Sequence, residues 1–327
     1  MPTMKFSPLL AVLFLTSLPG GQAAGPAHGA PWTIADPDLT LVPIASGSFT
    51  MGPGGAFGNP RLNLEFSPET RVTLTRPFWL GRTEVTQAQW QAVMGTSIQQ
   101  QWEMPNGSST AGSPPRGSKR ELDGVGPDHP MYCVTWEEAM EFCRRLTARE
   151  SAAGRLPAGH TFTLPTEAQW EYACRAGTTG DHAGNLDALG WYKENSGPIP
   201  IAHPVGRKQP NLWGLYDMHG NVPEWCSDWH GIYPGGEAVD PILEMYNHTR
   251  SVRGGSWFDD AEYVRSAHRA DMLPDWRRLR ARRPVGSVGI GFRVALTETA
   301  PASRTDAPAL RSAKNPAMAL PEKNASR

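Results

Sequence analysis

The chain has 327 residues, a formal net charge of −1, 39% hydrophobic residues and 19% charged residues. This balance is typical of a globular protein, excludes a largely disordered chain and gives no electrostatic reason to expect nucleic acid as a partner. The 34 glycines and 31 prolines indicate many turns between short regular elements, and the 12 tryptophans predict aromatic rings in the core or lining a cleft.

The first residues have the pattern of an export signal. Lys5 is followed by an apolar run over residues 9–18, and the small residues of Gly21-Gln22-Ala23-Ala24 offer a cleavage site. We therefore expect a signal peptide at residues 1–24, a periplasmic or secreted mature protein, and no stable membrane insertion after cleavage. A retained membrane anchor is the less favoured alternative, because the apolar run is short for a bilayer span.

The rest of the chain predicts one domain with a flexible segment at each end. Residues 25–38 are rich in Pro, Gly and Ala, which indicates a linker. Residues 298–327 lack any apolar period and are predicted to be disordered. Between them, residues 39–297 contain no linker-like break. Residues 96–128 have the character of a long insertion, which in a compact domain forms a lid, a binding loop or a disordered segment.

Within the domain, strands are expected first and helices later. Residues 41–44 and 47–52 indicate short strands around a turn, and residues 71–75 alternate polar and apolar side chains as a half-buried strand does. Capping boxes predict three helix starts, in which a threonine hydroxyl and a later Gln or Glu satisfy the first backbone N–H groups. These pairs are Thr86 with Gln89, Thr135 with Glu138, and Thr166 with Gln169. A tryptophan follows each start and is expected to anchor the helix to the core: Trp90, Trp136 and Trp170.

Four cysteines are present, and none shows the CxxC spacing of a zinc ribbon or a thioredoxin-type site. In an oxidising compartment they are expected to be buried thiols or to form one or two structural bridges. The four are Cys133, Cys143, Cys174 and Cys226. They allow three full pairings, and the sequence does not choose among them.

Several motifs resemble, in the same order, those of the formylglycine-generating enzymes, also called sulfatase-modifying factors. The series covers roughly residues 39–296. The resemblance implies a single α+β domain, loop-rich, with little regular secondary structure and a distant similarity to C-type lectins. The motifs are residues 43–52, 84–87, 134–139, 164–172 and 211–218, then Gly220-Asn221-Val222-Pro223-Glu224-Trp225, Arg253-Gly254-Gly255-Ser256-Trp257 and Gly291-Phe292-Arg293.

The resemblance implies a structural calcium site in the run from Asp217 to Glu224, which overlaps the first of these spelled-out motifs. Hard cations prefer several oxygen ligands, and this stretch offers two carboxylates around a glycine-containing turn. The alternative is that Glu224 caps a turn or pairs with an arginine. The matching positions are Asp217 and Glu224 through their side chains, and Gly220 and Val222 through their carbonyl groups.

The second motif lacks the residues that make family members oxidases. In those enzymes two copper-binding cysteines lie three and eight residues beyond the serine that matches Ser256, and the same count here reaches Asp259 and Val264. Cu(I) prefers sulfur ligands, and neither residue supplies one. Copper is therefore not expected as a cofactor, and formylglycine formation by the copper–cysteine route is not predicted.

An acidic cluster just beyond this turn is the alternative catalytic candidate. Ser256, Asp259, Asp260 and Glu262, with His268 nearby, offer a general base or a hard-metal site. The competing interpretation is a solvated loop, with Ser256 only holding the glycine turn.

Three functional hypotheses follow from these observations. The leading hypothesis is an exported maturation factor or oxidase, acting on another protein or a peptide-derived product as family members in pyoverdine maturation and nitrite-reductase assembly do. The alternative is a non-catalytic, calcium-stabilised module that binds a peptide or a glycan. A third hypothesis is a redox enzyme that uses the acidic cluster.

Overall fold

The structure is a computed structural model, and it describes residues 29–52, 68–103, 122, 124–198, 201–233, 235–275 and 289–299. The predicted signal peptide lies outside the described residues, as does the predicted disordered tail except for its first two residues. The centre of the predicted insertion, residues 104–121, also lies outside them.

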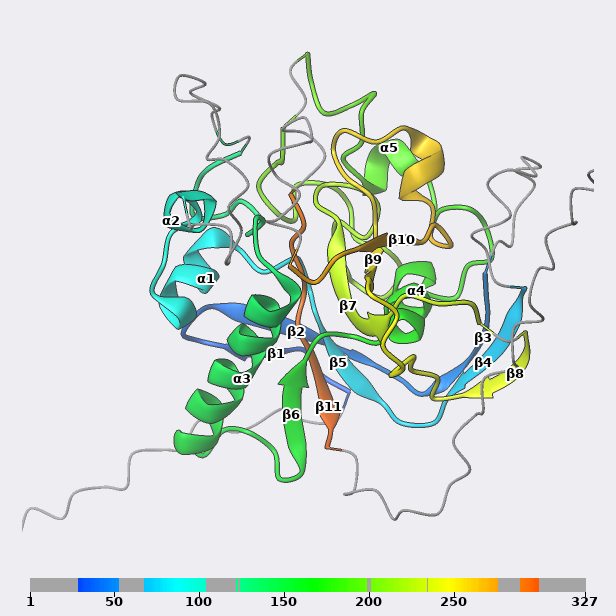
Figure 1. Ribbon diagram of the computed structural model, residues 1–327, viewed down its shortest axis with the longest axis horizontal. Helices are drawn as coiled ribbons and strands as arrows, with labels where there is room; N and C mark the ends of the chain where they lie inside the picture. Colours follow the sequence, from blue (N-terminus) through cyan, green and yellow to red (C-terminus); the bar gives the residue numbers. More distant parts are fainter. Residues whose placement is uncertain are drawn as a thin grey trace, which may run out of the picture.

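The largest sheet has five antiparallel strands in the order β1-β2-β5-β11-β6 (Figure 1). It joins strands from both ends of the domain, since β11 pairs with β5 on one side and with β6 on the other. The strands are β1 (Trp32–Ile34), β2 (Leu39–Ile44), β5 (Phe78–Gly81), β6 (His160–Thr163) and β11 (Ala295–Glu298).

The N-terminal boundary of the domain corrects one prediction. Residues 25–38 were expected to be a linker, but Trp32 and Ile34 are buried and lie in β1, which pairs with β2. The ordered fold therefore begins before residue 39. A strand of three residues is too short to produce a recognisable alternation in the sequence.

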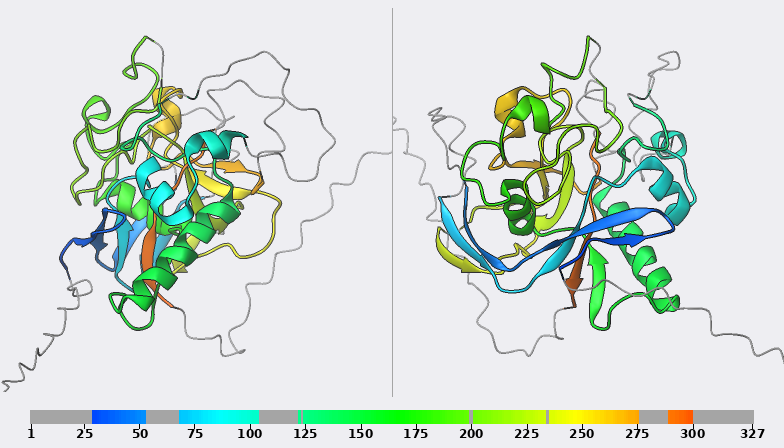
Figure 2. Two further views of the ribbon diagram at one scale, coloured as in Figure 1. Left: turned by 90° about the vertical axis from the view of Figure 1, so that its left-hand side faces the viewer. Right: turned by 180° about the vertical axis from the view of Figure 1, so that it is seen from behind.

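Two three-stranded sheets complete the strand framework. One has the order β3-β4-β8 and includes the parallel pair β4–β8; the other has the antiparallel order β10-β9-β7. Viewed from behind, β2 and β3 continue into each other alongside β5 and β4, so that the first small sheet extends the large one in a bent ribbon (Figure 2). The strands are β3 (Gly47–Met51), β4 (Thr70–Leu74), β7 (Glu224–Trp229), β8 (Gly236–Val239), β9 (Arg250–Arg253) and β10 (Ala270–Met272).

The helices lie on the strand framework, and three of them begin as predicted. All three capping boxes form, with both reciprocal hydrogen bonds present in each. Helix α3 packs along β6, whereas α4 contacts β3, β7 and β9. The helices are α1 (Gln87–Met94), α2 (Ile98–Glu103), α3 (Trp136–Ala152), α4 (Glu167–Arg175), α5 (Leu186–Leu189) and the 3-10 helix η1 (Ala261–Val264).

All three helix tryptophans pack against the core as expected. Trp90 and Trp170 are fully buried, and Trp90 stacks on Phe142 with ring centroids 5.9 Å apart. Trp136 is only partly buried, but it packs against the core and donates its indole N–H to the backbone oxygen of Cys226 at 2.8 Å. The guanidinium of Arg250 lies over its ring, 3.6 Å from the centroid. Within the described residues, no helix is long and apolar enough to cross a membrane.

Candidate functional site

The turn that follows β9 is the centre of the candidate site. Gly254 and Gly255 both have positive φ, at 94° and 69°. A Cβ atom on Gly255 would lie 2.6 Å from the backbone oxygen of Tyr263 and 2.8 Å from Cγ1 of Val264. Only glycine fits this position, so η1 can pack directly on the turn.

Ser256 and Asp259 are joined across this turn. One carboxylate oxygen of Asp259 accepts hydrogen bonds from the backbone N–H of Ser256 at 2.8 Å and from its hydroxyl at 2.7 Å. Burial raises the pKa of Asp259, while these bonds oppose that rise. Asp259 thus holds the turn in a fixed shape, and the Ser256 hydroxyl is committed to it as a donor.

A pocket of about 250 Å³ opens beside the turn, and we call it the Ser256 pocket. Asp259, Asp271 and His268 contribute polar groups to it, and burial together with the nearby Arg253 lowers the pKa of His268 to about 3. The imidazole is therefore neutral at physiological pH. The apolar part of the lining includes Val252, Trp257, Phe258, Met272 and Ile290.

The structure brings together only part of the predicted catalytic cluster. Ser256 and Asp259 line the pocket, but Asp260 and Glu262 are not among its lining residues. Asp260 instead accepts a 2.7 Å hydrogen bond from Lys193. The sequence analysis grouped the three carboxylates because they are close in the chain. In the structure, only Asp259 lines the pocket, because the chain turns into the 3-10 helix η1 directly after Asp260.

The positions that match the copper ligands do converge on the turn. Asp259 bonds to Ser256, and Val264 is fully buried against Gly255. All four cysteines of the chain are buried, and none lines the Ser256 pocket. Burial raises the pKa of Cys226 well above its usual range, which is typical of an inert thiol.

The predicted calcium motif is occupied in part by an ion pair. Both carboxylate oxygens of Glu224 accept 2.6 Å hydrogen bonds from Arg293, and one also accepts from the indole N–H of Trp170 at 2.8 Å. Pairing with an arginine was the alternative interpretation of Glu224. Arg293 is fully buried, so this pair belongs to the framework of the domain.

Asp217, unlike Glu224, is not paired with an arginine through both oxygens, and Glu84 is a neighbouring carboxylate that the sequence analysis did not assign to this site. One of its oxygens accepts from the backbone N–H of Gly206 at 2.6 Å, and the other is buried without a partner among the described residues. Glu84 is bonded in a similar way: one oxygen accepts a hydrogen bond from the backbone N–H of Val222 at 3.4 Å, and the other has no partner among the described residues. Burial, with Asp217 and Glu224 nearby, raises the pKa of Glu84 well above its usual value.

The two unpartnered carboxylate oxygens, one on Asp217 and one on Glu84, are the groups that a bound cation could satisfy. Burial also raises the pKa of Asp217, to about 6, and Glu224 adds to the rise. No group of three His, Cys, Asp or Glu side chains in the described part of the chain converges as a metal site. A calcium ion would thus need backbone carbonyls as well as Glu84 and Asp217, a mixed donor set that calcium accepts. The sequence analysis included Glu84 only as part of the motif at residues 84–87. No pattern in the sequence indicated that Glu84 lies near Asp217.

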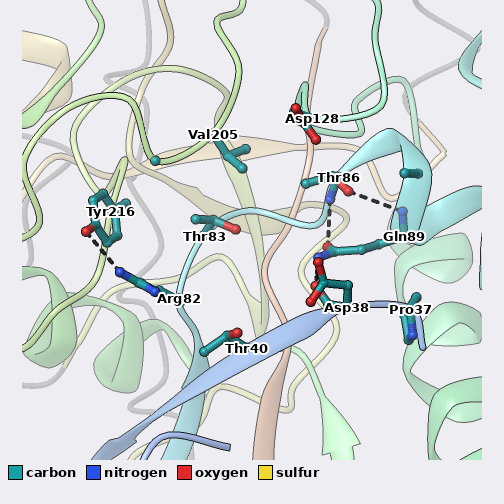
Figure 3. Close-up of a pocket in the computed structure, with 12 residues that line it drawn as sticks. Pro37, Asp38, Thr40, Arg82, Thr83, Thr86, Gln89, Asp128, Val205 and Tyr216 are labelled. Atoms are coloured by element: carbon teal, nitrogen blue, oxygen red, sulfur yellow. Dashed lines mark hydrogen bonds between the residues drawn. The ribbon is translucent and has the colours of Figure 1, made fainter. Parts of the chain in front are cut away.

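A polar pocket of about 380 Å³ opens near Asp217, and Figure 3 shows the residues that line it. Arg82 donates to the hydroxyl of Tyr216 at 3.0 Å on one side, and Asp38 and Asp128 lie on the other. Gly206, whose N–H binds Asp217, is part of the lining. The pocket therefore reaches close to the buried carboxylates from the surface.

Buried ion pairs support the Ser256 turn from behind. Arg253, the last residue of β9, is fully buried and pairs with Glu167 and Glu171 of α4. Arg269 forms a second pair with Glu167, at 2.6 Å. Arg253 ends β9 and Arg269 directly precedes β10, so the two arginines hold both strands against α4. These ion pairs fix the geometry of the site.

These features define a loop-rich α+β domain in which a glycine–serine turn borders a small pocket. Residues 35–297 match the model of the Sulfatase-modifying factor enzyme 1-like domain, and the chain belongs to this family. The formylglycine-generating enzyme of Streptomyces coelicolor is 30% identical over 325 residues, which cover 84% of this chain and 95% of that protein. The Chaperone protein LppX of Paenibacillus barcinonensis is 27% identical over 270 residues, covering 69% and 80%.

Solved structures show the same fold. PvdO from Pseudomonas aeruginosa superposes with a TM-score of 0.63 at 25% identity, covering 83% of this chain and 99% of that one. Treponema denticola variable protein 1 gives a TM-score of 0.59 at 28% identity, covering 81% and 98%. The predicted family and the mixed, loop-rich α+β fold are confirmed.

Proposed function

We propose that this protein is an exported accessory or maturation factor that binds a segment of another protein, or a peptide-derived product, at the Ser256 pocket. It does so without copper–cysteine oxidation. Support comes from the family, which includes both formylglycine-generating enzymes and a protein named as a chaperone.

One observation carries this proposal: the chemistry around the Gly255–Ser256 turn. The two positions that match the copper ligands hold a carboxylate bonded to Ser256 and a buried valine. A carboxylate is a hard ligand and a valine is none, so these two positions supply no soft donor, and no cysteine is among the described residues that line the pocket. The turn borders a concave, largely apolar pocket, which suits the binding of a side chain.

The negative half of the proposal is tested with copper and a peptide containing Cys-x-Pro-x-Arg. The purified mature protein is expected neither to retain stoichiometric Cu(I) nor to convert the peptide cysteine to formylglycine, as followed by mass spectrometry. Formylglycine at useful turnover by the wild-type protein would overturn the proposal.

A matched variant makes this test more informative. Asp259→Cys combined with Val264→Cys places two thiols around the same turn, and we expect this double variant to retain Cu(I). The single variant Asp259→Cys is the control. Copper retention by the wild-type protein equal to that of the double variant would contradict the assignment of these two positions.

Calcium is proposed as a structural ion, held by Asp217 and Glu84 with the backbone carbonyls of Gly220 and Val222. When bound, it would neutralise two buried carboxylates, each of which has one oxygen without a hydrogen-bond partner among the described residues. We expect added calcium to raise the melting temperature of chelator-treated protein, and Glu84→Gln to reduce that rise. An unchanged melting temperature in the wild-type protein would refute the calcium assignment while leaving the Ser256 pocket untested.

A non-catalytic module is the second candidate, favoured by the commitment of the Ser256 hydroxyl to Asp259. Metal analysis and oxygen uptake with a bound partner distinguish the two: calcium alone, with no oxygen consumed, favours binding only. Replacing Asp259, Asp260 and Glu262 together by alanine abolishes turnover only if the acidic cluster is catalytic. Export is tested by the N-terminal sequence of protein recovered from the periplasm, which is expected to begin near residue 25.

A further inference from the structure

A third and larger pocket is lined by residues of β3, of β4 and of the C-terminal end of α4, and we call it the Trp213 pocket. Figure 1 shows where these three elements lie in the fold. The pocket has a volume of about 470 Å³, which falls in the range of roughly 300–1,000 Å³ that small-molecule sites occupy. It shares no lining residue with the Ser256 pocket. Nothing in the proposed function uses it.

Three aromatic rings form one side of this pocket. Phe49 of β3 and Tyr172 of α4 have ring centroids 5.3 Å apart at an interplanar angle of 45°. Tyr172 and Trp213 meet edge to face, with centroids 4.8 Å apart at 67°. Because the rings are inclined to one another and touch, they present a continuous apolar wall with more than one ring face.

The wall is held in place by contacts outside the pocket. The side-chain oxygen of Asn211 accepts from the backbone N–H of Trp213 at 3.0 Å, and its amide donates to the backbone oxygen of Ala173 in α4 at 2.8 Å. Tyr172 lies so close to Gly47 that a Cβ atom there would be 2.3 Å from its hydroxyl oxygen. A ligand therefore meets a wall that is already ordered, which lowers the entropic cost of binding.

The rest of the lining is polar and balanced in charge. Thr50 and Thr179 bring hydroxyl groups, and Glu69 and Arg71 bring one negative and one positive group. The remaining charged lining residue, Arg175, is buried and paired with Glu171 at 2.8 Å. Among the described residues, the lining thus carries no excess positive charge for a phosphate and no excess negative charge for a cation.

We propose that the Trp213 pocket binds a neutral saccharide. A pyranose ring has an apolar C–H face, which matches an aromatic wall, and hydroxyl groups around its edge, which match hydroxyl, carboxylate and guanidinium partners. This inference goes beyond the proposed function, because it concerns a different pocket and a different kind of ligand.

Saturation-transfer NMR with the full mature protein tests the proposal. The probes are glucose, galactose, N-acetylglucosamine, cellobiose and chitobiose, with hexaproline and inorganic phosphate as probes of other chemistry. At least one saccharide is expected to bind, and Trp213→Ala to weaken it by about tenfold or more. Leu212→Ala is the matched control, since Leu212 adjoins Trp213, is 78% exposed and does not line the pocket.

Rim variants keep the test valid if the loss of Trp213 disturbs the fold. Thr179→Val and Glu69→Gln change exposed groups, and each is expected to weaken saccharide binding severalfold at an unchanged melting temperature. The proposal is overturned if no saccharide binds at tens of millimolar. It is equally overturned if binding survives in all three pocket variants, or if only hexaproline or phosphate binds. None of these results bears on the Ser256 pocket.

Discussion

The Glu224–Arg293 pair and the Ser256 pocket lie on neighbouring parts of the fold, since β7 pairs with β9. The carboxylates of the two regions differ in their bonding. Both oxygens of Glu224 are committed to a buried arginine, whereas Asp259 is bonded through one oxygen to Ser256 and lines an open pocket. The first arrangement has the character of a framework and the second that of a site. The comparison teaches that two carboxylates on neighbouring parts of the fold can have different roles: one stabilises the framework, and the other lines a pocket.

The largest effect is expected from breaking the framework pair. Glu224→Ala leaves Arg293 buried without a counter-charge and the Trp170 N–H without its acceptor, so it should lower the free energy of unfolding by about 3–5 kcal/mol. Asp259→Ala removes only the bonds from Ser256 and should cost about 1 kcal/mol. Urea denaturation compares the two variants. Equal losses would show that Asp259 is also a framework residue.

The next effect concerns the turn that joins the two regions. Gly255→Ala must place a Cβ atom against the backbone of Tyr263 at positive φ, and should cost about 3 kcal/mol. Gly177→Ala is the control, because Gly177 also has positive φ, at 88°, but a Cβ atom added there would meet no other atom within 4 Å. The control should lose only the conformational part, about 1 kcal/mol. If both variants lose the same amount, the close packing of η1 on the turn does not matter for stability.

A smaller effect is expected from acid, through His268 in the pocket wall. Its pKa is lowered to about 3 by burial and by Arg253, so the folded state stays unprotonated while the unfolded chain takes up a proton below about pH 6.5. The free energy of unfolding therefore falls as the pH falls from 6.5 towards 3. His268 should account for about 2 kcal/mol of the loss between pH 7 and pH 5.

Denaturation at a series of pH values measures this contribution. His268→Gln should be less steeply destabilised by acid than the wild-type protein, whereas His248→Gln, which changes an exposed histidine, should keep the wild-type slope. Parallel slopes for wild-type protein and His268→Gln would show that the imidazole is solvated and already protonated in the folded state at pH 5.

Local patterns in the sequence determined the local structure. The three capping boxes predicted three helix starts, because each depends only on residues three positions apart. The alternation before Thr75 predicted β4 for the same reason. The ordered motifs also determined the family and its α+β fold. The three-residue strand β1 escaped detection, because it is defined by its pairing with β2 and not by any pattern of its own.

The tertiary structure alone decided how the carboxylates are used. Glu84 and Asp217 are far apart in the chain, and so are Glu224 and Arg293, but folding brings each set together in a buried environment where charge has to be matched. The separation of Asp260 and Glu262 from the Ser256 pocket was decided in the same way. Residue types could be read from the sequence, but their partners depend on distances that only the folded chain sets.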